Sequence, residues 1–149
     1  MNHAYLLKPN LNKPLKVNRV IDTNIALVKL FPGISKAVME SILNTKGLKA
    51  VVMETFGAGN CTTERWFIDL LENAISRGIY IINITQCISG TINMGQYETS
   101  NQLKEIGVIS GKDMTTESAI CKLMLSLGPI KTSKKFKQHY EKALCGELS

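Results

Sequence analysis

Three short, nearly uninterrupted apolar segments constrain this chain more than any other feature of its sequence. They span residues 24–31, 49–54 and 79–84, and the segments between them carry apolar residues at helical spacing. Strands that are apolar on both faces are typical of a parallel sheet covered by helices on each side. The sequence therefore predicts a three-layer α/β domain of the Rossmann or flavodoxin kind, with a parallel sheet of about four strands.

Helices are expected between and after these strands. One helix should begin after Ser35 and end near Gly47, because Ser is a favoured N-cap and Gly a favoured C-terminal stop. A capping-box pattern, Thr99 with Gln102, predicts the start of a helix over residues 99–106. The remaining helices are predicted over residues 63–77, 115–127 and 133–144.

The chain is expected to form one domain preceded by an arm. Residues 1–23 carry two prolines and little periodicity, so they are predicted to be a linker or arm, and residues 24–149 the domain. With 149 residues, 44% of them apolar, the chain is long enough to bury one core. The best apolar run, residues 79–84, is far shorter than the ~20 residues of a membrane-spanning helix, so no membrane partner is expected.

Charge and cysteine content exclude further classes of function. The net charge of +6 lies mostly at the two ends of the chain, which favours a solvated basic helix face over a nucleic-acid surface. The four cysteines lie at least 24 residues apart, which predicts free thiols and neither a metal site nor a redox pair. The start of the chain shows no secretion signal, so the cytoplasm is the expected compartment.

Ligands of a parallel sheet bind at the carboxyl ends of the strands, which here open into residues 54–60 and 85–95. The first loop, Gly-Ala-Gly-Asn at residues 57–60, lacks the third glycine of a dinucleotide fingerprint, because position 62 is Thr62. Asn60 and the following helix start suit a small carboxylate or amide. A plain turn is the alternative, because glycine-rich strand-to-helix turns are common.

The second loop gathers a thiol, a phenol and a carboxylate in Cys87, Tyr97 and Glu98, which suggests a polar pocket. Cys87 has no histidine in sequence reach, since His3 and His139 lie in the terminal segments. A structural thiol is therefore favoured over a nucleophile. The residues alone predict an α/β domain with a polar site and no catalytic machinery of its own.

Several motifs in the same order carry a resemblance to a known family. They are METFGAGN at residues 53–60, TERWF at 63–67, NITQC at 83–87, NMGQYET at 93–99 and GVISGKDMTTE at 107–117. Together they resemble the C-terminal domain of the type I, cytosolic L-asparaginases. The similarity extends over residues 24–127.

The resemblance implies hydrolysis of L-asparagine to L-aspartate and ammonia by a threonine nucleophile, without metal or cofactor. In that family the nucleophile belongs to an N-terminal domain, and each active site forms between that domain and the C-terminal domain of a neighbouring subunit. The N-terminal motifs are not found in these 149 residues, and Thr91, within Ser-Gly-Thr-Ile, only imitates one of them. We therefore expect no catalytic residue in this chain, and as partners L-asparagine, an N-terminal asparaginase domain and further copies of the subunit.

The resemblance also assigns roles to single residues. Asn60 resembles the asparagine that reaches toward the neighbouring subunit's substrate, and Tyr97 resembles a tyrosine that approaches the same site. Cys87 matches a cysteine of the effector site at which some members bind asparagine. Glu54 stands where the regulated bacterial relative has an arginine, and a carboxylate there would repel the carboxylate of the effector. A strand-end carboxylate satisfied by backbone donors is the alternative for Glu54.

Two other functions compete with that of an asparaginase domain. The first is a stand-alone asparagine-binding regulatory module that keeps the effector pocket around Cys87. The second is the related amidotransferase subunit that acts on glutaminyl-tRNA precursors. The amidotransferase is disfavoured because Gln86, Cys87 and residues 94–99 follow the asparaginase pattern more closely.

Overall fold

The computed structural model describes residues 12, 14, 17–94, 98–128 and 133–149. Within them, four parallel strands form one sheet, in the order in which they occur along the chain. The strands are β1 (Ile25–Lys29), β2 (Ala50–Thr55), β3 (Tyr80–Thr85) and β4 (Ile109–Ser110). The predicted parallel α/β sheet is confirmed.

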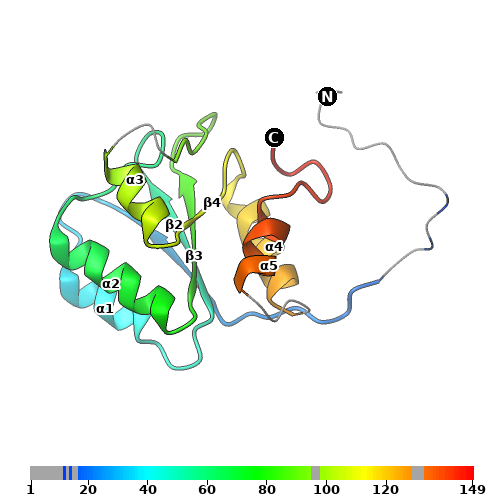
Figure 1. Ribbon diagram of the computed structural model, residues 1–149, viewed down its shortest axis with the longest axis horizontal. Helices are drawn as coiled ribbons and strands as arrows, with labels where there is room; N and C mark the ends of the chain where they lie inside the picture. Colours follow the sequence, from blue (N-terminus) through cyan, green and yellow to red (C-terminus); the bar gives the residue numbers. More distant parts are fainter. Residues whose placement is uncertain (1–11, 13, 15–16, 95–97, 129–132) are drawn as a thin grey trace.

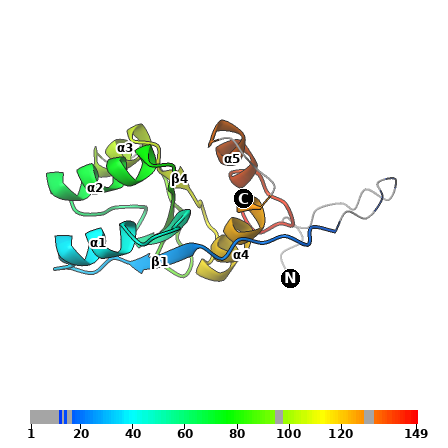
Figure 2. The same ribbon diagram turned by 90° about the horizontal axis from the view of Figure 1, so that it is seen from below.

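Helices cover both faces of this sheet (Figures 1 and 2). α1 (Lys36–Leu43), α2 (Arg65–Ser76) and α3 (Glu98–Glu105) lie on one face. Each of these helices connects two neighbouring parallel strands. Because the three crossovers have the same handedness and run in the same direction across the sheet, all three helices lie on the same side. α4 (Thr116–Leu127) and α5 (Ser133–Tyr140) cover the opposite face. None of the helices in the described part of the chain is long and apolar enough to cross a membrane.

Alternate residues of the central strands feed two separate apolar clusters. Val51 and Met53 of β2 pack in the cluster under α1 and α2, whereas Ala50 and Val52 pack in the cluster with α4 and α5. All four side chains are at most 2% exposed. Because both faces of the sheet are covered, the strands need apolar residues at every position, which accounts for the continuous runs in the sequence.

α1 begins after Ser35, the cap that the sequence indicates, and α4 begins after Thr115, which the sequence placed as the first residue of that helix and which is its cap. The side chain of Ser35 accepts a hydrogen bond from the backbone N–H of Val38, and that of Thr115 accepts one from Ser118, both at 3.3 Å. These bonds satisfy backbone donors that the first helical turn leaves open. The capping box predicted at Thr99 is wrong, because α3 already begins at Glu98.

The last helix has a buried apolar face beside its basic face. Phe136 and Tyr140 are 0% exposed, and the Phe136 ring stacks on Tyr80 with the ring centroids 3.8 Å apart. The Tyr140 hydroxyl donates a hydrogen bond to the carbonyl of Ala119 at 2.8 Å, so α5 is fastened to α4. The helix that composition predicted to be basic and solvated therefore also packs an apolar face into one of the two apolar clusters of the sheet.

The chain that leads into β1 is tied to the domain at Asp22. Its backbone N–H donates to the carbonyl of Met124 at 3.0 Å, and its carboxylate pairs with Lys49. The hydrogen bond from Lys49 lowers the pKa of Asp22 to about 2. The division into an arm (1–23) and a domain (24–149) stays a prediction, because residues 1–11 lie outside the described part of the chain.

A buried ion pair holds the C-terminal segment against α4. The ammonium of Lys122 lies 2.6 Å from the Glu147 carboxylate, and the two side chains are only 3% and 8% exposed. Lys122 also donates to the carbonyl of Lys142 at 2.8 Å, and Glu147 accepts from the backbone N–H groups of Leu144 and Cys145. Both charges are therefore paired and hydrogen-bonded, as buried charges must be.

Replacing Glu147 with Gln should destabilise the fold by about 3 kcal/mol, because the Lys122 ammonium would stay buried without an anion. As a control, Glu40→Gln breaks the exposed pair between Glu40 and Lys36, with N and O 3.7 Å apart. This control should cost less than about 0.5 kcal/mol. Urea unfolding of the two variants measures both values, and equal losses would contradict the assignment.

The same pair predicts how stability depends on pH. Burial raises the pKa of Glu147, but the hydrogen bonds from Lys122 and the backbone outweigh it and lower the pKa from 4.5 to about 2. The stabilisation from a carboxylate of lowered pKa is complete above pH 4.5 and is lost as the pH falls toward about 2. The unfolding free energy should therefore fall across this window, and it should fall less in Glu147→Gln.

Candidate functional site

A polar pocket lies where strands β1 to β3 end and α4 begins. Its volume is about 290 Å³. Lys29, Glu54 and Thr85 line it from the strands, residues 86–88 and Gly90 from the loop after β3, and residues 113–117 from the turn into α4. We call it the strand-end pocket, and its position is the one at which parallel α/β sheets bind ligands.

Glu54 is the carboxylate around which the strand-end pocket is organised. The residue is 8% exposed, and its Oε1 atom accepts a hydrogen bond from the Thr116 hydroxyl. The ammonium of Lys29 lies 3.7 Å from its other carboxylate oxygen. The Glu54 carboxylate is thus paired and hydrogen-bonded by side chains from β1 and α4. The alternative that the sequence analysis gave for Glu54 expected backbone donors instead.

The loop after β3 is fixed by side-chain hydrogen bonds. The Thr85 hydroxyl donates to the carbonyl of Gly57 at 2.5 Å and accepts from the backbone N–H of Cys87 at 3.0 Å. The Gln86 amide donates to the carbonyl of Leu30, just after β1, at 2.7 Å and to that of Glu54, near the end of β2, at 3.0 Å. Cys87 is therefore presented at the pocket on a loop that is tied to all three strand ends.

Gly90 lets this loop turn back tightly on itself. A Cβ atom at this position would lie 2.8 Å from the Thr85 side chain and 2.9 Å from the Cys87 Cβ. Contacts that short are not tolerated, so any other residue at this position would displace Thr85, Cys87 or the loop itself.

Two fully buried polar residues support the neighbouring turn after β2. The Thr55 hydroxyl donates to the Asn83 side-chain oxygen at 2.6 Å, and the Asn83 amide donates to the carbonyl of Gly59 at 3.4 Å. Asn60 closes the turn, because its backbone exchanges hydrogen bonds with Phe56 at 2.8 and 2.9 Å. Asn60 therefore sits on a supported turn, and it is not among the residues that line the strand-end pocket.

The structure brings together part of the predicted site. Glu54 and Cys87 line one pocket, whereas Asn60 lies in the adjacent turn and Tyr97 falls outside the described residues. Sequence reasoning missed Lys29 and Thr116, which contact Glu54. A signal existed for Lys29, the only charged residue in the apolar run 24–31, and Thr116 stands in the motif at 107–117, but no pattern indicated its contact with Glu54.

The strand-end pocket is acidic. Glu54, Asp113 and Glu117 line it against the single lysine, Lys29. Burial raises the pKa of Asp113, but hydrogen bonds from Ser149 outweigh it and lower the pKa below its usual value. Three carboxylates favour a ligand with an ammonium or amide donor and disfavour an anion that does not reach Lys29.

The thiol and hydroxyl groups of this pocket have no imidazole beside them, because none of the described residues that line it is a histidine. Among the described residues, no three His, Cys, Asp or Glu side chains are grouped so that they could hold a metal ion.

The model of the glutaminase/asparaginase C-terminal domain family matches residues 24–139. The chain belongs to this family. The match covers the sheet, helices α1 to α4, α5 almost to its end, and the strand-end pocket.

Relatives and solved structures agree with the assignment to the asparaginase C-terminal family. The chain is 36% identical to L-asparaginase 1 of Escherichia coli (strain K12) over 135 residues, 91% of this chain and 40% of the relative. It is 37% identical to the 60 kDa lysophospholipase of Homo sapiens over 128 residues, 86% of this chain and 22% of the relative. The crystal structure of L-asparaginase I from Vibrio cholerae superposes with a TM-score of 0.86, at 35% identity, over 93% of this chain and 41% of that one.

These matches confirm the predicted resemblance to the C-terminal domain of type I asparaginases. The chain spans about 40% of the length of the E. coli relative that it matches. The roles predicted for Asn60, Tyr97, Cys87 and Glu54 stay predictions.

The cysteines offer a probe of the strand-end pocket. Cys87 is exposed, whereas burial raises the pKa of Cys61 to about 11. Iodoacetamide should therefore label Cys87 at least about tenfold faster than Cys61 at neutral pH, as peptide mass spectrometry would show. A ligand in the pocket should slow the labelling of Cys87 but not that of Cys121, which is exposed on α4. Equal rates at Cys61 and Cys87 would contradict the structure of this region.

Proposed function

We propose that this chain is the C-terminal part of an amidohydrolase that converts L-asparagine to L-aspartate and ammonia. The family match over residues 24–139 carries the proposal. In this function an N-terminal asparaginase domain supplies the threonine nucleophile, and the reaction needs no metal or cofactor. The C-terminal part shapes the substrate pocket and the contact between subunits, and the enzyme is a homo-oligomer.

One structural observation supports this division of labour. The turn that carries Asn60 is supported by hydrogen bonds of the buried Thr55 and Asn83 side chains. Such support suits a residue that must reach a substrate outside its own domain. The free state of all four cysteines suits the reducing cytoplasm, where we expect the enzyme to work.

The decisive experiment measures ammonia release from L-asparagine. The purified 149-residue chain should release none, and the same chain joined to the N-terminal domain of E. coli L-asparaginase 1 should regain activity. In the joined enzyme, Asn60→Ala should lower kcat/KM by about tenfold or more through lost positioning of the substrate. Asn73→Ala, at an exposed site on α2, is the matched control and should change nothing.

One result would overturn the proposal directly. If the isolated chain hydrolysed L-asparagine and lost this activity on Thr91→Ala, the nucleophile would lie in this chain. Full activity of the joined enzyme after Asn60→Ala would remove only the role of Asn60.

A second candidate function is a stand-alone asparagine-binding regulatory module. One observation favours it: Cys87 and Glu54, the two residues matched to the effector site, line the same pocket. In this function Lys29 attracts the carboxylate of the amino acid, while Glu54 repels it and accepts a hydrogen bond from its ammonium.

Calorimetry with L-aspartate and L-asparagine tests the module. Glu54→Gln should strengthen binding of L-aspartate by about fivefold or more, because it removes a repelling charge and releases Lys29 from its ion pair. Lys29→Gln should weaken binding, and Glu40→Gln on α1 should leave it unchanged. If neither the natural chain nor Glu54→Gln binds at millimolar concentration, the module is excluded while the asparaginase proposal stands.

A further inference from the structure

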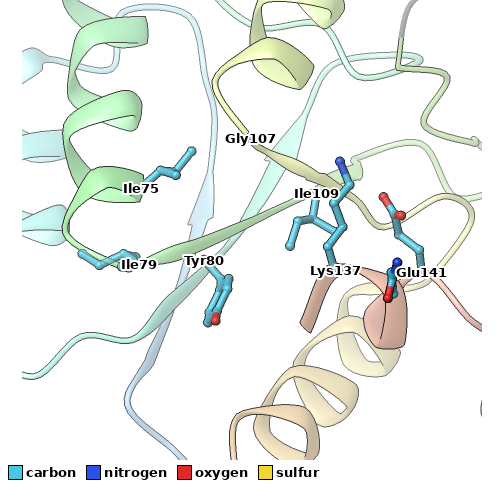
Figure 3. Close-up of a pocket in the computed structure, with 9 residues that line it drawn as sticks. Ile75, Ile79, Tyr80, Gly107, Ile109, Lys137 and Glu141 are labelled. Carbon is cyan, nitrogen blue, oxygen red and sulfur yellow. The ribbon is translucent and has the colours of Figure 1, made fainter. Parts of the chain in front are cut away.

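A second pocket lies at the amino end of the sheet, opposite the strand-end pocket (Figure 3). It is bounded by the end of α2, the start of β3, the approach to β4, and α5. Its volume is about 560 Å³, within the range of small-molecule sites. We call it the amino-end pocket, and it shares no lining residue with the strand-end pocket.

The amino-end pocket exists because β4 is short. β4 pairs with Ile82 and Asn83 of β3, although β3 begins earlier, at Tyr80. The chain ahead of β4 passes through Gly107, whose φ of 101° is a left-handed conformation that glycine adopts without strain. The space beside the start of β3 is therefore bordered by α2 and α5 instead of by another strand.

The floor of the amino-end pocket is apolar and firmly held. Ile79 and Ile109 are 6% and 3% exposed, and Ile75 of α2 adds a third aliphatic side chain. The Tyr80 ring is fixed by its stacking on Phe136. Such a floor suits an aliphatic or aromatic group.

Two opposite charges stand at the rim of this apolar floor. Lys137 and Glu141 lie one helical turn apart, and their side chains rise from the α5 region in the same direction, toward β4 (Figure 3). The salt bridges found within the described residues all join other groups. An ammonium and a carboxylate thus remain available beside one apolar surface.

We propose that the amino-end pocket binds the zwitterion of an apolar α-amino acid. The ligand carboxylate contacts Lys137 and its ammonium contacts Glu141. Its side chain lies against Tyr80 and Ile109 on the α5 face of the sheet and extends past the edge of β3 toward Ile75 and Ile79. Side chains one turn apart have Cβ atoms about 5–6 Å from each other, and flexible Lys and Glu can both reach charges on one Cα atom.

This charge arrangement selects between ligand classes. A simple carboxylate would leave Glu141 facing an anion, and a simple amine would leave Lys137 facing a cation. L-Asparagine carries both charges, but its side-chain amide would lose hydrogen bonds to water on the apolar floor. The amino-end pocket is therefore a site for a ligand other than the substrate of the proposed function.

Isothermal titration and NMR on the 149-residue chain test the proposal with L-phenylalanine as the probe. L-Phenylalanine should bind with shifts centred on Tyr80 and Ile109. 3-Phenylpropionate lacks the ammonium and 2-phenylethylamine lacks the carboxylate, and each should bind at least about fivefold more weakly. L-Asparagine in excess should not displace L-phenylalanine.

Variants of the rim complete the test. Lys137→Gln and Glu141→Gln should each weaken L-phenylalanine binding by about tenfold, and Lys135→Gln, exposed on the same helix, should leave it unchanged. Circular dichroism verifies that all three variants fold.

Three results would overturn the proposal: no binding at about 10 mM, equal binding of 3-phenylpropionate, or unchanged affinity in Lys137→Gln and Glu141→Gln. A dimer in sedimentation that these two variants dissociate would also overturn it, because the pocket would then be a subunit contact. None of these outcomes bears on asparagine hydrolysis by the joined enzyme.

Discussion

The order of the strands is the constraint on which the rest of this domain depends. Because the four parallel strands follow chain order, every crossover moves in the same direction and its helix lands on the same face. The other face would expose Val52 and Ile82 to water if nothing followed β4. α4, α5 and the segment fixed by the Lys122–Glu147 pair cover it, so the last forty or so residues complete the core of the sheet.

The same order determines where ligands can bind. Parallel strands share one carboxyl end, and the start of α4 closes over it, which gathers Lys29, Glu54 and Cys87 around one cavity. At the other end the short β4 leaves a gap beside β3 that α5 only partly fills. The two pockets therefore differ in character: one is acidic and hydrogen-bonded, and the other is apolar with charges at its rim.

Local patterns in the sequence predicted most of the fold. The apolar runs gave the three long strands to within a residue or two, and Ser35 marks a helix start because a cap acts over three residues. β4 has two residues, too few for any periodicity, so its position could not be predicted. The contact between Thr116 and Glu54 joins residues 62 positions apart, and it depends on how α4 packs, which no local pattern encodes.

In the part of the chain that the structure describes, strand β1 is an open edge of the sheet and pairs with β2 alone. Leu27, 48% exposed, lies on this edge, and an unpaired strand with an exposed apolar residue is a template for aggregation. The Lys29 side chain is 67% exposed on the same strand, and a lysine there opposes pairing with a second chain. Lys29 thus pairs with Glu54 and also opposes the pairing of strand β1 with a second chain. A substitution of Lys29 that changes ligand preference therefore also makes the protein more prone to aggregate.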